Sequence, residues 1–156
     1  MLFWTLAVLQ WLHVFFAIFW FGSVLTIDFL IVPTLQSLPA EVQHAFGGAL
    51  GRRAPKLITP VAGAVILLGI LRGIAGGVLG NLGSAYGASW IASLLLAVGL
   101  MSFGLRVITP AVEKLQRTPQ GAEFVAAVNR VKGLTLAELG GFLLIISFMI
   151  AMRFGY

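Results

Sequence analysis

The sequence predicts an all-α, polytopic membrane protein whose four transmembrane helices form a four-helix bundle. Of its 156 residues, 60% are hydrophobic and only 10% are charged, and the mean hydropathy is +1.04. A soluble domain is roughly 45–50% apolar and about 25% charged. A water-soluble globule of this size could not bury so much apolar surface, so that class is excluded. The length favours a single transmembrane domain over residues 1–156.

Four apolar segments are long enough to cross a bilayer, which takes about 20 residues. The first is longer than a ~30 Å hydrocarbon core requires, so we expect it to tilt or protrude. It has neither the basic start nor the cleavage site of a signal peptide, so we expect it to be retained. The segments run from Leu2 to about Pro33, from about Leu57 to Leu79, from about Tyr86 to Pro110 and from about Leu134 to Phe154.

A weak internal repeat predicts two helical hairpins in tandem. Ile31-Val32-Pro33 closes the first span and Ile108-Thr109-Pro110 closes the third. The hairpins would cover about residues 1–82 and about residues 83–156. Thr135-x-x-Glu138 has the spacing of a capping box, which predicts the start of the fourth span there.

The basic residues predict the orientation in the cell membrane. Eight of the ten lie at or between spans one and two or spans three and four, and only Arg72 and Arg153 lie near the opposite face. The positive-inside rule then places both long loops in the cytoplasm and both termini outside. The net charge of +5 is too dispersed for a nucleic-acid partner. Four aromatic residues map to the outer rim: Trp4, Tyr86, Trp90 and Tyr156.

Glycines mark a helix surface that a neighbour can approach closely. Two small-x-x-x-small pairs lie within about 60° of one another on a helical wheel, and Gly140-Gly141 of the fourth span could receive that face. Plain helix packing is one interpretation, and room for a flat macrocycle against bare backbone is the other. The glycines are Gly69, Gly73, Gly76 and Gly80.

Polar groups inside the membrane carry the functional information, because each costs about 2.5–3.5 kcal/mol if it is left unpaired. Gln10, His13 and Asp28 fall on one stripe of the first span, which should face the bundle interior. Asp28 should be neutralised by Arg106, Arg52 or Lys56. His13 is either a hydrogen-bonded core imidazole, a metal or haem ligand, or a proton-transfer group, and Gln10 could hold its second ring nitrogen.

Two further pairs could complete a site with His13. Met149 and Met152 lie one helical turn apart near the outer half of the fourth span, and soft sulfur with imidazole suits Cu(I). Methionines also fill gaps in apolar cores. Arg72 and Arg153 occupy the outer ends of their helices, where they either snorkel to headgroups or bind an anion such as the haem propionates.

The segment Trp11-Leu-His13 to Trp20-Phe-Gly22 resembles the opening of copper-resistance D (CopD)-type membrane proteins and their four-span relatives. Gly51-Arg52-Arg53, the stretch leading to Arg72, and Met152-Arg153-Phe154 are similar to later segments of that family. The resemblance implies copper handling. The HemJ-type protoporphyrinogen oxidases are also similar, with a first-span histidine in the place of His13, which implies b-type haem and porphyrin oxidation. They carry a lysine in the third span, where this chain has only Arg106.

Three functions therefore stay open. The chain handles copper at His13, Met149 and Met152; or it is a b-type haem protein with His13 as axial ligand; or it is a structural subunit of a homo-oligomer or larger membrane complex. No hydrolase or phosphate-loop motif occurs, and no carboxylate pair is positioned for acid–base hydrolysis. Catalytic residues are not assigned. Because there are no cysteines, disulfides and thiolate metal sites are excluded and the redox compartment is undetermined.

Overall fold

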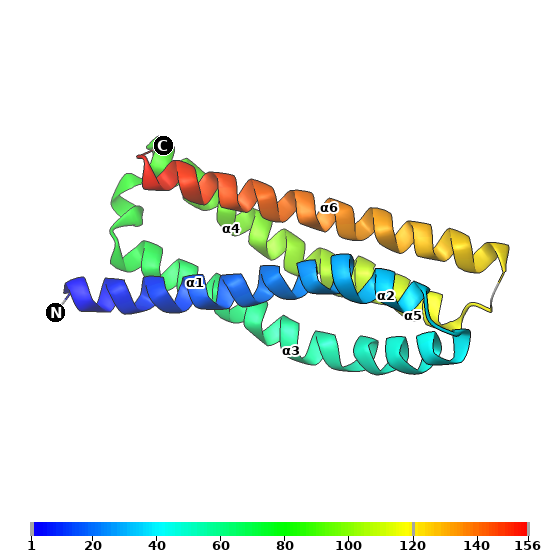
Figure 1. The fold of residues 1–156 in the computed structure, drawn as a ribbon. Coiled ribbons are helices and arrows are strands. Elements are labelled where there is room, and N and C mark those ends of the chain that lie inside the picture. The colour runs from blue at the N-terminus through cyan, green and yellow to red at the C-terminus, as the bar shows by residue number, and fades with distance from the viewer. Residues whose placement is uncertain (1, 120, 156) are drawn as a thin grey trace.

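The computed structural model, which describes residues 2–119 and 121–155, is a four-helix bundle (Figure 1). The described residues contain no strand. Four continuous helical stretches are long and apolar enough to cross a membrane. The fold class predicted from the sequence is therefore confirmed. The four stretches are Leu2–Gln36, Ala40–Ala75, Ala85–Arg117 and Ala122–Arg153.

The first and third stretches are each divided by a π-helical turn. The elements in chain order are α1 (Leu2–Thr26), the π-turn η1 (Ile27–Ile31), α2 (Val32–Gln36), α3 (Ala40–Ala75), the 3₁₀ turn η2 (Val78–Asn81), α4 (Ala85–Phe103), the π-turn η3 (Gly104–Ile108), α5 (Thr109–Arg117) and α6 (Ala122–Arg153).

Both π-turns stand directly before an x-Pro step, so the two Ile-x-Pro motifs adopt the same local structure. η1 precedes Pro33 and η3 precedes Pro110, and each proline lies in the first turn of the helix that follows. A proline ring clashes with the carbonyl of the preceding turn and supplies no N–H. Widening that turn to π geometry relieves the clash without ending the helix.

The membrane-crossing helices begin earlier than the apolar segments do. α3 starts at Ala40 and α6 at Ala122, where the sequence analysis expected spans from Leu57 and Leu134. Apolar composition marks the part of a helix that meets lipid, whereas an exposed polar extension of the same helix has no such signal. The capping-box interpretation of Thr135 and Glu138 is therefore wrong, because both lie inside α6.

α3 also ends sooner than expected, at Ala75 and not at Leu79. Gly76 caps the helix, and Gly77 has a φ of 82°, a left-handed conformation that glycine adopts without strain. The chain then turns through η2 into α4, where the Ser84 hydroxyl accepts a hydrogen bond from the Gly87 N–H at 3.2 Å.

The bundle consists of two antiparallel helix pairs. α1 packs mainly along α3, and α4 packs mainly along α6. The pairs meet at Trp20 of α1 and Phe142 of α6, whose rings stand edge to face with centroids 4.9 Å apart. Both chain ends and the α3–α4 connection lie at one end of the bundle, and the other two connections lie at the opposite end (Figure 1). The buried core contains Trp20, Val24, Ala62, Val65, Leu100 and Phe142.

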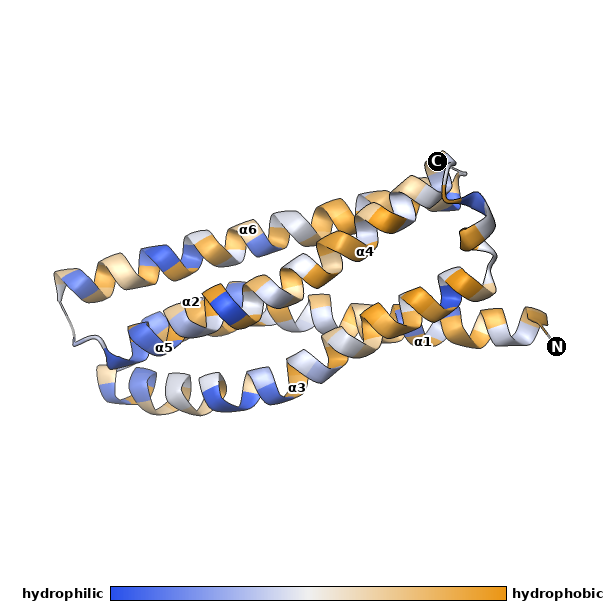
Figure 2. Ribbon diagram, turned by 180° about the vertical axis from the view of Figure 1, so that it is seen from behind, coloured by the Kyte–Doolittle hydropathy of each residue, from blue (hydrophilic) through white to orange (hydrophobic). Residues whose placement is uncertain are grey.

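The outer surface of the bundle suits a lipid environment. Large apolar side chains such as Trp11, Ile18, Leu67, Leu95 and Leu144 are exposed along the helices. Figure 2 shows hydrophilic residues gathering where α3 and α6 begin and where α5 ends. A soluble protein rarely exposes contiguous apolar surface on this scale, so the chain is compatible with a multi-pass integral membrane protein.

Candidate functional site

His13 is buried in the seam between α1 and α3. Its exposed fraction is 7%, whereas His44 near the start of α3 is exposed. The imidazole lies against the backbone of Gly69, where a Cβ atom would stand 3.0 Å from His13 Cε1. Any larger residue at position 69 would compete with the ring for this space, so the glycine is what admits the histidine to the seam.

One nitrogen of the His13 ring is held by the partner helix. Nδ1 lies 2.9 Å from the backbone carbonyl oxygen of Val65. Because a carbonyl oxygen can only accept, Nδ1 carries the proton and donates. In the neutral imidazole the lone pair is then on Nε2. A backbone contact of this kind at one ring nitrogen is the arrangement that fixes the tautomer of a metal-binding histidine.

The sequence analysis expected Gln10 to hydrogen-bond one ring nitrogen of His13, but the Val65 carbonyl takes that place. Gln10 is exposed on α1, and the second-nitrogen partner is the Val65 carbonyl. His13, Trp20 and Val24 are buried on one face of the helix, as the stripe predicted. The N-terminal part of α1 extends past the end of the neighbouring helices (Figure 1).

Met149 and Met152 are partly buried on α6, a different helix from the one that encloses His13. His13 precedes Trp20 by seven residues and Met149 follows Phe142 by seven residues. Since Trp20 and Phe142 are in contact and the two helices are antiparallel, His13 and Met149 lie at a similar depth. No hydrogen bond joins either sulfur to His13 in the described part of the chain, and a shared site stays a prediction.

The two outer arginines differ from one another. Arg72, in the last turn of α3, is half-buried, and its Nε is a buried atom without a hydrogen-bond partner in the described residues. The Arg72 guanidinium occupies the place that a Cβ on Gly76 would take. Arg153 ends α6 and is exposed. Both lie at the end of the bundle that holds the α3–α4 connection, and a shared anion site stays a prediction.

The glycine face of α3 is filled by side chains of this protein. His13 lies on Gly69, and the indole of Trp90 from α4 occupies the place of a Cβ on Gly73. Gly76 and Gly80 do not extend the face, because the helix ends at Ala75. Gly141 of α6 receives Leu100 of α4 and not α3, while Gly140 faces open space. The predicted close packing is therefore present at Gly69 and Gly73, but the face has no room for a macrocycle.

Two carboxylates, Asp28 and Glu138, lie near enough for the charge of one to act on the other. Asp28 in η1 is half-buried, and Glu138 in α6 is 8% exposed. The Thr135 hydroxyl, one turn before Glu138, donates to the Lys132 carbonyl at 3.2 Å. The expected neutralisation of Asp28 by Arg106, Arg52 or Lys56 does not occur, because these basic side chains are exposed and none pairs with it.

Sequence reasoning missed this pair because it placed Glu138 at a helix start. With α6 beginning at Ala122, Glu138 lies sixteen residues inside the helix, level with η3. The usable signal was the helix-forming stretch 122–133, which is continuous with the apolar span and contains no proline.

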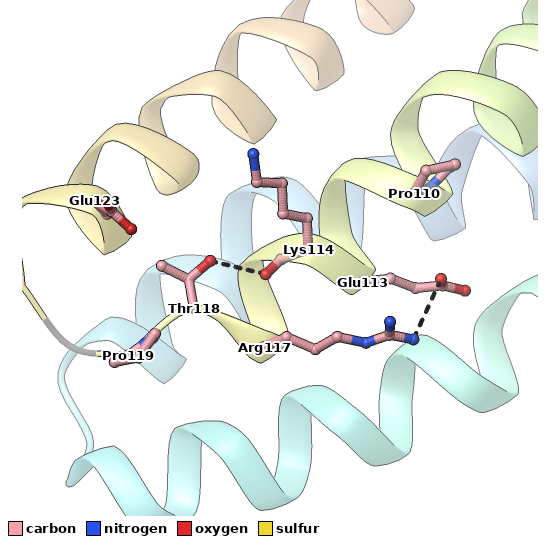
Figure 3. Close-up of a pocket in the computed structure, with 7 residues that line it drawn as sticks. All are labelled: Pro110, Glu113, Lys114, Arg117, Thr118, Pro119 and Glu123. Carbon is pink, nitrogen blue, oxygen red and sulfur yellow. Dashed lines mark hydrogen bonds and ion pairs between the residues drawn. The ribbon is translucent and has the colours of Figure 1, made fainter.

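An open polar hollow of about 400 Å³ lies between the end of α5 and the start of α6 (Figure 3). Arg117 and Glu113 in its wall form an ion pair at 4.0 Å, and the Thr118 hydroxyl donates to the Lys114 carbonyl at 2.9 Å. Lys114 and Glu123 complete its charged lining, so charges of both signs balance. The hollow has no excess of either charge and favours no charged ligand.

Comparisons with protein-family models, with curated proteins and with solved structures find no match for this chain.

Proposed function

We propose that this integral membrane protein binds copper(I) in the outer half of the bundle, with Nε2 of His13 as the central ligand. The observation that carries the proposal is the hydrogen bond from Nδ1 to the Val65 carbonyl, which leaves the Nε2 lone pair available.

The chemistry of the surrounding side chains supports copper over harder metals. The chain has no cysteine, and no group of three or more His, Asp and Glu side chains in the described residues could hold a metal ion. A metal at His13 would therefore take its other ligands from thioethers. Met149 and Met152 lie at a similar depth, and imidazole with thioether sulfur is a donor set for Cu(I). The sequence likeness to CopD-type proteins agrees with this choice.

A b-type haem on the glycine face does not fit the residues present. That face is occupied by the His13 and Trp90 rings, and nothing on it remains for a porphyrin to lie against. The unpartnered Nε of Arg72 suits an anion, whereas Arg153 is exposed. Haem binding and a purely structural role are the two alternative results of the experiment described next.

The test is copper content after loading with Cu(I) under reducing conditions, on protein purified in a mild detergent. We expect one copper per chain in the wild type, loss of copper in His13→Ala, and retention in His44→Ala, which changes an exposed histidine. Met149→Leu and Met152→Leu should each weaken binding at least tenfold in a competition with a Cu(I) chelator, because leucine keeps the volume and removes the sulfur.

A visible spectrum of the same preparation separates the alternatives. A Soret band that disappears in His13→Ala would identify a haem protein. A colourless preparation without copper, in wild type and variants alike, would identify His13 as a core residue and leave the structural-subunit function.

A further inference from the structure

An open groove of about 500 Å³ runs along the outside of the bundle between α1 and α3. The lining residues of its α1 wall recur every four positions between Ile18 and Ile31 of η1, so they share one face of the helix. Its α3 wall runs from Leu50 to Ile58. His13 and the residues that enclose it do not line the groove, which is therefore separate from the proposed copper site.

Small residues leave this groove open. On α1, Gly22 has open space where a Cβ atom would stand, and Ser23 lies next to it in the lining. On α3, the facing wall contains Ala54. Since no side chain of the described residues reaches the position of a Cβ on Gly22, another molecule can occupy the space beside it.

The lining is apolar apart from two small hydroxyl residues and one cation. The Thr26 hydroxyl donates to the Gly22 carbonyl at 2.8 Å, so its hydrogen is already bonded within α1. Arg53 is the one charged residue of the lining in the described part of the chain, and it is exposed. It forms no ion pair and no hydrogen bond with residues 2–119 and 121–155, so its guanidinium is available to an anion.

The groove begins at headgroup level and leads into the hydrocarbon core. Ile27 comes 23 residues after Trp4 of the outer rim, or about 35 Å along the helix, which exceeds the ~30 Å core. From Ile31 back to Ile18 the groove extends about 20 Å, enough for the ~15 Å of one leaflet and the start of its headgroup layer. Because α3 runs antiparallel to α1, Arg53 lies toward the headgroup end.

An anionic phospholipid has the same order of parts, with a long apolar chain that ends in a phosphate. Basic pockets between transmembrane helices at the cytoplasmic side are sites for such headgroups. A second copy of this chain is a poorer match for the groove. Its own groove would bring a second Arg53 and no acid, because no acidic side chain of the described residues lines it.

We propose that this groove binds an anionic phospholipid from the leaflet at the basic end of the bundle. One acyl chain lies against Gly22 and Ala54, and the Arg53 guanidinium donates hydrogen bonds to the phosphate oxygens. A zwitterionic headgroup carries its own cation beside the phosphate, so Arg53 favours a headgroup with a net negative charge. The bound lipid contacts both α1 and α3, the two helices that enclose His13, and its binding does not depend on copper.

Native mass spectrometry of the protein in a mild detergent tests the proposal, with phosphatidylglycerol and phosphatidylcholine of identical acyl chains as probes. The wild type should bind its first phosphatidylglycerol more tightly than its first phosphatidylcholine. Arg53→Gln should weaken phosphatidylglycerol binding about fivefold, the usual contribution of one basic side chain near an anionic lipid surface, and should change phosphatidylcholine binding less. The matched control Arg130→Gln, at an exposed position outside the groove, should keep the wild-type affinities.

A second variant tests the apolar part of the groove. Gly22→Leu places a side chain in the open space and should weaken the binding of both lipids, while the protein still folds because a Cβ there meets nothing within 4 Å. Gly140→Leu on α6 is the matched control, since its Cβ also meets nothing within 4 Å and it lies outside the groove. It should bind both lipids as the wild type does.

Four results would overturn the proposal. Equal affinity of the wild type for the two lipids would mean that only unspecific surrounding lipid covers the groove. An equal loss in Arg53→Gln and Arg130→Gln would mean a general effect of surface charge. Competition by glycerol phosphate, which has no acyl chain, would make Arg53 a site for free phosphate compounds. Dimers that disappear in Gly22→Leu would place a second copy in the groove. If Gly22→Leu fails to fold, the comparison of the two lipids in Arg53→Gln still decides.

Discussion

The two halves of the bundle bury polar side chains to the same extent but treat them differently. His13 is 7% exposed and Glu138 is 8% exposed. His13 has a backbone carbonyl from the neighbouring helix at 2.9 Å, so its burial is compensated within the fold. Glu138 has no hydrogen-bond donor among the described residues. Equal burial therefore carries different meanings: at His13 the fold supplies a hydrogen-bond partner, and at Glu138 the described residues supply none.

The largest expected effect concerns which end of the bundle faces the cytoplasm. The chain has no cysteine, so single cysteines can be introduced without background. Gly83→Cys, at the end with both termini, should react with a membrane-impermeant thiol reagent in intact cells. Ser37→Cys, at the opposite end, should react only after the membrane is opened. Reaction of Ser37→Cys in intact cells would invert the positive-inside assignment and exchange the sides of the two sites.

The next largest effect is a loss of stability when the close packing of α3, which borders His13, against α4 is disturbed. Gly73→Leu should lower the free energy of unfolding by about 1–3 kcal/mol, because its side chain would overlap the Trp90 indole. Thermal unfolding in detergent measures the loss. Gly99→Leu on α4 is the matched control, since a Cβ there meets nothing within 4 Å. Equal melting temperatures for the two variants would show that α3 and α4 are not packed through this glycine.

A smaller loss of stability is expected when His13, the buried side chain with a hydrogen-bond partner, is removed. His13→Ala loses the hydrogen bond to Val65 and the packing against Gly69, which should cost about 1–2 kcal/mol without metal present. The same unfolding measurement on metal-free protein gives the number. His44→Ala should change stability by less than about 0.5 kcal/mol, because that ring is exposed. A His13→Ala variant as stable as the wild type would remove the contrast with Glu138.

The smallest effect is expected for exposed charges at the basic end. The Arg117 and Glu113 side chains are 83% and 60% exposed and form an i,i+4 pair at 4.0 Å. Arg117→Gln should lower stability by about 0.3 kcal/mol at low salt and by less at high salt. A loss above about 1 kcal/mol would mean that the polar hollow beside it contributes to folding.

The fold class followed from the sequence because bilayer insertion depends on composition over about 20 residues, which any single sequence displays. The Ile-x-Pro motifs did not end their spans as expected, because a π-turn precedes each proline and the helices continue to Gln36 and Arg117. The repetition of the motif and the buried face through His13, Trp20 and Val24 did follow from the sequence. These are local properties of one helix. The helix ends were mistaken for the same reason, because the stretches 40–56 and 122–133 are helical but not apolar.

The tertiary structure alone decided which polar groups meet. His13 and Val65 are 52 residues apart and Asp28 and Glu138 are 110 apart, so no periodicity within one helix relates them. The partner of His13 is a backbone carbonyl, which every residue carries and no sequence pattern singles out. The opposition of Asp28 and Glu138 depends on where α6 begins and on how the two helix pairs align through Trp20 and Phe142. Sequence thus determined the kind of solvent this chain requires, and packing determined which of its buried groups are left in need of a ligand.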